Sequence, residues 1–141
     1  VKLAVLQHHE RMDGTGFPNH RKANTIHLYA RIVAVADVYD NITSERQGYV
    51  KQTPFAAVEF FKQEMYRGLD PNVCVPLLTR IRDSLLGSPV LLNTGQIGRI
   101  VYFAKDILAQ PVIELEGIPE GYESTVDLNQ HPELQVVEYN P

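Results

Sequence analysis

The stretch HHERMDGTGFP, residues 8–18, decides how the rest of the chain is interpreted. Two adjacent histidines and two carboxylates follow an apolar run, and such groups are typical ligands of hydrolytic transition-metal sites. Gly14 and Gly16 let the backbone turn sharply or approach another group closely, and Pro18 restricts the exit direction. A lone histidine on an apolar face is usually a hydrogen-bonded core residue, but this pair with its carboxylates favours a metal site.

The composition is that of an ordinary soluble protein, with 141 residues, 44% of them hydrophobic, and a net charge of -4. This length allows one domain or two small ones. No basic face indicates binding to a nucleic-acid polymer, and the apolar runs are too short for a membrane segment. We therefore expect a cytoplasmic protein, in which the single cysteine, Cys74, is a small buried hydrophobe.

Apolar positions at helical spacing predict four helices in the first part of the chain. The expected helices cover residues 1–12, 25–44, 53–66 and 70–86. Thr25 is a candidate N-cap, while Thr53-Pro54 and Asp70-Pro71 each combine a cap with a proline at the first helical position. Pro76 should kink the fourth helix or delay its start. The first helix has no cap, so we expect the natural chain to extend upstream.

After Gly87 the hydrophobic period changes from 3.6 to 2, which indicates strands. The expected strands cover residues 90–92, 97–103, 111–116, 124–128 and 134–139. Asn93-Thr94-Gly95 is a hairpin turn between the first two. The sequence therefore predicts an α+β fold, with a helical part over residues 1–87 and a small antiparallel β module over 88–141.

Asp37 interrupts a helix that is apolar nearly all round and is therefore expected to be buried. A buried carboxylate without a partner costs several kcal/mol. Arg31, Arg46 or a histidine could neutralise it, and the alternative is that Asp37 binds a metal ion. Asp40 follows one turn later on the same side.

Two ordered patterns resemble the HD-GYP family of metal-dependent phosphohydrolases. The first is His-His-Glu-x-x-Asp-Gly-x-Gly-Phe-Pro over residues 8–18, in which Phe17 replaces the usual tyrosine. The second, ARIVAVADVYDNITSER, covers residues 30–46. The resemblance extends over about residues 1–85. It implies that the helical part is the C-terminal half of an all-α HD-type domain, whose characterised activity is hydrolysis of cyclic di-GMP in bacterial signal transduction.

The resemblance also implies roles for individual residues. The matched metal ligands, which would also be the catalytic residues, are His8, His9 and Asp37. The matched residues that would support these ligands or shape the loop are Glu10, Asp13, Gly14, Gly16 and Asp40. Arg46 matches a substrate-phosphate contact. Lys51 is the candidate for a second such contact, in a stretch that departs from the family pattern by an apparent one-residue insertion.

A complete domain of this family would hold two or three divalent transition metals, iron or manganese, and would hydrolyse a cyclic dinucleotide. The family's His-Asp dyad precedes the paired histidines, and no counterpart occurs in this chain. We therefore expect a fragment of an active parent enzyme, inactive alone and with weak or no metal binding. The alternative is a degenerate module that binds or regulates without hydrolysis. Either way, an uncovered helical face predicts self-association.

Overall fold

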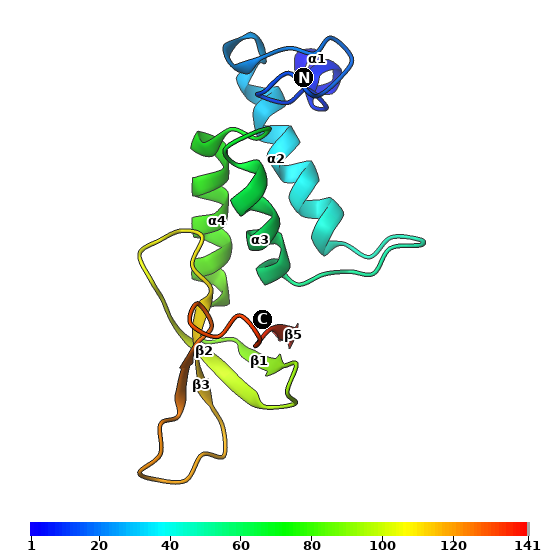
Figure 1. Ribbon diagram of the computed structural model, residues 1–141. Helices are drawn as coiled ribbons and strands as arrows, with labels where there is room; N and C mark the ends of the chain where they lie inside the picture. Colours follow the sequence, from blue (N-terminus) through cyan, green and yellow to red (C-terminus); the bar gives the residue numbers. More distant parts are fainter. Residues whose placement is uncertain (141) are drawn as a thin grey trace. The chain divides into compact units, whose positions relative to one another are not determined.

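A computed structural model describes residues 1–140 and divides the chain into a helical unit, residues 1–77, and a sheet unit that begins at Leu78. The helices are α1 (Lys2–Gln7), α2 (Leu28–Thr43), α3 (Pro54–Glu64) and α4 (Pro71–Leu85), with a 3-10 turn at Ala23–Thr25 (Figure 1). The strands are β1 (Pro89–Leu92), β2 (Ile97–Phe103), β3 (Pro111–Leu115), β4 (Thr125–Asp127) and β5 (Val136–Tyr139). The predicted α+β fold is confirmed. The division between units lies inside α4, and the domains 1–87 and 88–141 stay a prediction.

The first helix is shorter than predicted, because α1 ends at Gln7 rather than Met12. Beyond Gln7 the backbone bonds to distant loops instead of continuing the helix. The carbonyl of His9 accepts a hydrogen bond from the Phe17 N–H (3.2 Å), and the Met12 N–H donates to the Gly68 carbonyl (2.8 Å). These bonds replace helical ones, so the two histidines lie at the helix end and in the turn that follows it.

α2 begins later than predicted and has an exposed apolar side. Its N-cap is His27, whose Nδ1 accepts a hydrogen bond from the Tyr29 N–H (3.1 Å). The predicted cap, Thr25, instead closes the preceding 3-10 turn. The prediction that this helix is buried nearly all round is also wrong, because Ile32 and Val33 are 43% and 39% exposed. The helix packs against α1 and α3, which leave this side open.

The predicted starts of α3 and α4 are confirmed. Thr53 Oγ1 accepts a hydrogen bond from the Ala56 N–H (3.3 Å), and Asp70 Oδ1 accepts one from the N–H two residues later (2.9 Å). Both caps precede a proline at the first helical position. Because α4 starts directly after Asp70, Pro76 lies inside this helix and does not delay its start.

Apolar side chains from α2, α3 and α4 form the core of the helical unit. Cys74 belongs to this core, and burial raises the pKa of its thiol to about 12. The thiol therefore stays protonated at neutral pH, as expected of a small buried hydrophobe. The buried apolar residues of this unit include Ile26, Ala30, Ala34, Val35, Phe55, Ala57, Phe61, Met65 and Leu69.

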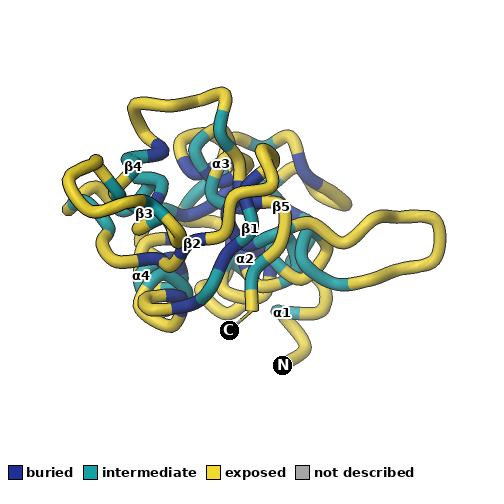
Figure 2. The backbone as a smooth tube through the Cα atoms, turned by 90° about the horizontal axis from the view of Figure 1, so that it is seen from below, coloured by how far each residue is buried: buried dark blue, intermediate teal, exposed yellow. Residues whose placement is uncertain are grey.

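The sheet unit contains one antiparallel sheet in the order β4-β3-β2-β1-β5. Buried positions alternate with more exposed ones along β1 and the first part of β2 (Figure 2), as the period of 2 predicts. The hairpin turn between them contains Gly95 at φ +86°, a conformation that favours glycine. Arg82 on α4 donates to the carbonyls of Ala104 and Asp106, which fixes the end of α4 to the β2–β3 loop.

Over residues 1–140, no helix combines the length and the apolar character needed to span a bilayer.

Candidate functional site

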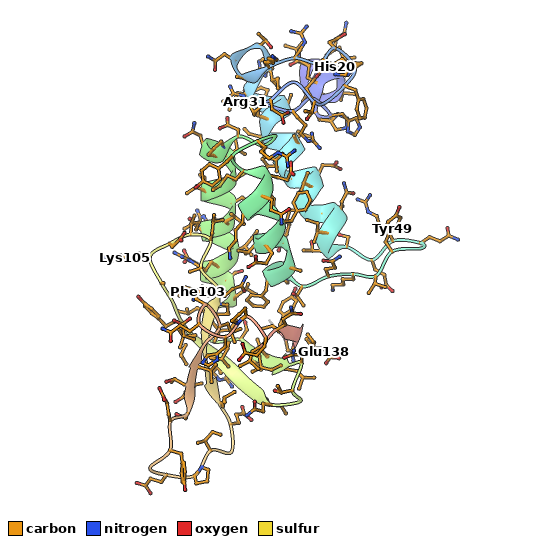
Figure 3. All side chains as sticks on the ribbon, viewed as in Figure 1. His20, Arg31, Tyr49, Phe103, Lys105 and Glu138 are labelled. Atoms are coloured by element: carbon orange, nitrogen blue, oxygen red, sulfur yellow. The ribbon has the colours of Figure 1, made fainter. Side chains whose placement is uncertain are left out.

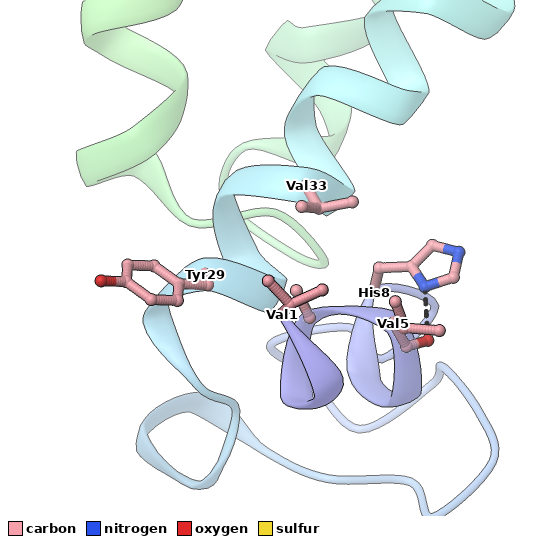
Figure 4. A pocket seen from close by; sticks show the side chains of 6 residues that line it. Val1, Val5, His8, Tyr29 and Val33 are labelled. Carbon is pink, nitrogen blue, oxygen red and sulfur yellow. Dashed lines mark hydrogen bonds between the residues drawn. The ribbon is translucent and has the colours of Figure 1, made fainter.

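The imidazole of His8 is held at the end of α1 with one nitrogen left for a ligand. His8 is the C-cap of α1, and its Nδ1 lies 2.8 Å from the Val5 carbonyl oxygen (Figure 4). A carbonyl only accepts hydrogen bonds, so Nδ1 must carry the proton and donate it. Nε2 then holds the free lone pair, which is the arrangement found in metal-binding histidines whose other ring nitrogen donates to a backbone carbonyl.

The ring of His9 is oriented by packing. Its centroid lies 3.8 Å from that of His8 and 4.7 Å from that of Phe17, and the planes of His9 and Phe17 differ by only 21°. Phe17 is 58% exposed, so the ring that stacks on His9 lies at the surface. The aromatic residue of the Gly-x-Gly-Phe-Pro turn therefore contacts one of the predicted ligands directly through its ring.

Glu10 connects the histidine pair to the loop that follows. The side chain is buried, with 2% of the residue exposed. Its Oε1 accepts a hydrogen bond from the Asn19 N–H (2.7 Å), and its Oε2 accepts one from the Arg21 N–H (2.9 Å). A carboxylate that accepts backbone N–H bonds makes strong, charge-assisted contacts. In this structure Glu10 fixes the backbone of the loop, and the supporting role implied for it at a metal site stays a prediction.

Replacing Glu10 with glutamine should destabilise the helical unit by about 2 kcal/mol. The amide has one acceptor oxygen, so its NH2 group would face one of the two N–H donors, and hydrogen bonds to a charged group are worth about 1.5–3 kcal/mol. Urea unfolding followed by circular dichroism measures the change. The exposed Glu45 offers a control, since Glu45→Gln should shift the midpoint little. Equal midpoints for both variants would contradict the role given to Glu10.

Two glycines and one aspartate shape the loop. Gly14 has φ +82°, and a Cβ added at Gly16 would collide with the backbone of residues 9–11. Asp13 Oδ1 accepts hydrogen bonds from the Thr15 hydroxyl (2.6 Å) and N–H (3.0 Å). Both hydrogen bonds lower the pKa of the Asp13 carboxyl, and the bond from the hydroxyl has the larger effect. The loop thus lies directly on the histidine-bearing backbone.

Neither arginine considered as a partner for Asp37 pairs with it. Arg31 forms an ion pair with the buried Asp70 at the start of α4 (2.6 Å), and Arg46 pairs with Asp40 (2.7 Å). Arg31 lies in the first part of α2 (Figure 3). Asp37 is half-buried rather than fully buried, and its Oδ2 accepts a hydrogen bond from Asn41 Nδ2 (3.1 Å). Within residues 1–140 no basic side chain forms an ion pair with Asp37.

The predicted phosphate contacts lie on an exposed loop between α2 and α3. Arg46, with a side chain 48% exposed, is held by Asp40. The hydroxyl of Ser44 donates to Asp40 Oδ1 (2.6 Å). This hydrogen bond and the one from Arg46 both lower the pKa of Asp40, and the bond from Ser44 has the larger effect. Lys51 is exposed, and Tyr49 lies toward the tip of the loop (Figure 3). The loop presents its cations to solvent, where an anionic ligand could reach them.

The described residues include candidate metal ligands but no complete metal site. The chemistry of the donors is suitable, because His8 presents a free Nε2 and Asp37 has no cationic partner. However, in residues 1–140 no group of three His, Cys, Asp or Glu side chains is close enough to hold a metal ion. The structure therefore does not assemble His8, His9 and Asp37 into a metal site, and their ligand roles stay predictions.

An apolar pocket of about 440 Å³ lies beside His8. It is lined by residues of α1 and α2 together with their flanking positions, namely Val1, Ala4, Val5, His8, Tyr29 and Val33 (Figure 4). One of these lining residues, Val33, belongs to the exposed apolar side of α2.

Sequence reasoning missed three sets of contacts that hold the site together. Gln7 is buried, and its Oε1 accepts a hydrogen bond from the His27 N–H (2.9 Å), which joins α1 to the start of α2. The Arg31–Asp70 pair joins α2 to α4 across 39 residues. Arg11 donates to the carbonyls of His8 and Glu10. A polar residue inside an apolar helical pattern was the available signal for Gln7 and Arg31, but the partners are distant in sequence.

Comparison with known proteins gives consistent matches. The model of a family described as HD domain matches residues 1–73. The cyclic di-GMP phosphodiesterase response regulator RpfG of Xanthomonas campestris is 43% identical over 83 residues, which are 59% of this chain and 22% of that protein. A cyclic di-GMP phosphodiesterase of Pseudomonas aeruginosa is 37% identical over 97 residues, 68% of this chain and 23% of that protein.

A 3'3'-cGAMP-specific phosphodiesterase of Vibrio cholerae is 31% identical over 65 residues, which are 46% of this chain and 14% of that protein. The chain therefore spans less than a quarter of the length of each of these three relatives.

Proposed function

Because the chain belongs to the HD domain family and carries the HD-GYP sequence pattern, we propose that it is part of a metal-dependent phosphohydrolase that hydrolyses a cyclic dinucleotide. Cyclic di-GMP is named for two of the relatives and 3'3'-cGAMP for a third. We assign the longer enzyme to bacterial signal transduction in the cytoplasm, and we expect its isolated fragment to self-associate through the uncovered side of α1 and α2.

The histidine pair carries this proposal. The bond from His8 Nδ1 to the Val5 carbonyl leaves Nε2 as the nitrogen that can bind a metal. His9 is packed between His8 and Phe17, so that little rotational freedom remains to be lost on binding. In the described part of the chain, neither imidazole forms a hydrogen bond to the loop, since the loop is held by Glu10 and by the backbone.

The chain would supply His8, His9 and Asp37, and the remaining ligands would come from residues outside it. Two or three iron or manganese ions bound in a complete site would lower the pKa of a water molecule and neutralise charge on the scissile phosphate. Metal affinity depends on a complete shell, so the chain alone should bind such ions weakly.

The substrate's phosphate would meet Arg46 and Lys51. A phosphate oxygen would compete with Asp40 for the Arg46 guanidinium, whose planar fork suits phosphate as well as carboxylate. Because both partners of the present ion pair are exposed, this exchange costs little desolvation. Lys51 would add a second positive charge from the same loop.

The test is hydrolysis by the longer protein encoded by the reading frame around this chain. We expect linear products from cyclic di-GMP or 3'3'-cGAMP with Mn²⁺ or Fe²⁺ present, loss of activity after chelation, and recovery when metal is returned. High-performance liquid chromatography measures the products. If the frame encodes no further histidine and aspartate ligands and the protein hydrolyses neither dinucleotide, the proposal is wrong.

A degenerate binding module is the second candidate. It is favoured by the absence of any three-ligand cluster in residues 1–140. Such a module would bind a cyclic dinucleotide or a partner without hydrolysing it. Calorimetry that detects binding, in the absence of any product with Mn²⁺, would select this alternative. Hydrolysis by the purified chain with Mn²⁺ would eliminate it.

A further inference from the structure

We infer that Arg11 is a positioning residue for the histidine pair, an inference that rests on the proposed function. A single guanidinium nitrogen, Nη1, donates to the carbonyl of His8 (3.2 Å) and to that of Glu10 (3.1 Å). These two carbonyls belong to the peptide group before His9 and to the peptide group after Glu10. Arg11 therefore holds the two peptide groups at the ends of the His9-Glu10 dipeptide.

The backbone carbonyls after α1 show why this contact matters. The carbonyl of Gln7 accepts from the Glu10 N–H (2.9 Å), and that of His9 from the Phe17 N–H (3.2 Å). The carbonyls of His8 and Glu10 are bonded by the side chain of Arg11 instead. Since this segment has left the helix, the arginine supplies the donors that helical N–H groups would otherwise provide.

The stem of Arg11 packs on the turn that follows α3. A Cβ built on Gly68 would lie 3.2 Å from Arg11 Cδ, which shows that the aliphatic stem rests on this glycine. The neighbouring Met12 N–H donates to the Gly68 carbonyl (2.8 Å). The side chain of Arg11 thus contacts the buried turn after α3 with its stem and the histidine turn with its guanidinium.

If Arg11 acted on the metal site only through its positive charge, its removal would change metal affinity in the opposite direction to a loss of positioning. A positive charge near the ligands repels a metal cation, so removing it would tighten binding. Loss of positioning would weaken binding, by about 10-fold if Arg11 resembles other residues that orient metal ligands. The direction of the change therefore separates the two roles.

The experiment compares the full 141-residue chain with its Arg11→Ala and Arg11→Lys variants. ¹⁵N relaxation should show that the order parameter of the His9 amide falls from about 0.85 to below about 0.6 in Arg11→Ala. Mn²⁺ titration followed by electron paramagnetic resonance should show about 10-fold weaker binding. Arg11→Lys should be intermediate, since an ammonium lacks the planar fork. The exposed Arg67 provides the charge-matched control, Arg67→Ala.

The inference would be overturned if the His9 amide of Arg11→Ala kept the order parameter of the wild type. It would also be overturned if Arg11→Ala bound Mn²⁺ as tightly as the wild type or more tightly. If the wild-type chain binds no Mn²⁺ while His9 loses order in the variant, the positioning role stands and the metal role in the proposed function is weakened. Should Arg11→Ala fail to fold, the comparison of Arg11→Lys with the wild type decides: a loss of His9 order supports the inference, and wild-type order rejects it.

Discussion

Replacing Gly16 with alanine should destabilise the helical unit by about 3 kcal/mol or more. The added Cβ would collide with the His9 carbonyl oxygen and the Arg11 nitrogen, and it would lie 2.6 Å from the Glu10 carbonyl carbon. These are backbone atoms, so no flexible side chain can move aside to relieve the overlap. Overpacking of this kind commonly costs 1–3 kcal/mol and occasionally more. Chemical unfolding followed by circular dichroism measures the loss.

Gly48 offers a matched control for this substitution. It lies in the exposed loop after α2 with φ +84°, and a Cβ there would meet no atom within 4 Å. Gly48→Ala should therefore cost only the strain of the left-handed conformation, about 1 kcal/mol. A Gly16→Ala variant that is as stable as Gly48→Ala would show that the loop does not lie against residues 9–11.

Replacing His8 with alanine in the longer enzyme should lower the rate of cyclic dinucleotide hydrolysis roughly 1,000-fold. A bound metal contributes several kcal/mol to stabilising charge in the transition state, and that free energy corresponds to such a factor. The substitution removes a proposed ligand whose other contacts are a local hydrogen bond to Val5 and packing against the neighbouring His9 ring, so folding should change little. Initial rates at saturating Mn²⁺ and substrate measure the effect.

His131→Ala serves as the control for the His8 substitution. His131 lies in a turn of the sheet unit, where its Nδ1 is 3.0 Å from Glu133 Oε1 and both side chains are about half exposed or more. Its removal should leave the rate within about twofold, because exposed pairs of this kind contribute little. Equal rates for His8→Ala and the wild type would show that His8 is not a metal ligand.

Sequence patterns correctly predicted the structural features that depend on residues close together in the chain. Thr53-Pro54 and Asp70-Pro71 cap their helices as predicted, since a cap involves atoms only a few residues apart. Gly95 turns the first hairpin for the same local reason. The resemblance to the HD-GYP family is confirmed by the HD domain match and by the cyclic dinucleotide phosphodiesterases among the relatives.

The sequence was insufficient where distant backbone groups compete with a helix. Apolar spacing continues to Met12, but the bonds to Phe17 and Gly68 end α1 at Gln7. Burial of α2 was overestimated for a related reason, because a fully apolar helix does not reveal which of its sides has neighbours. The ion pair of Arg31 with Asp70 joins residues 39 apart, and nothing local identified that partner for Arg31.

The structure shows how the candidate site residues are held in place, but it does not show what they bind. The acceptor role of Glu10 and the turn at Gly14 and Gly16 are visible in the hydrogen bonds and backbone angles. The ligand roles of His8, His9 and Asp37 need metal and further ligands, and residues 1–140 hold no cluster of three such groups. These three assignments therefore remain predictions.

The most direct measurement is a crystal structure of the longer protein grown with Mn²⁺, with the metal located by its anomalous scattering. The account predicts a metal ion about 2.0–2.3 Å from His8 Nε2, with His9 and Asp37 bound to the same ion or to its neighbour. Metal bound elsewhere, with His8 Nε2 hydrogen-bonded only to protein or water, would contradict the central claim that the histidine pair is part of a metal site.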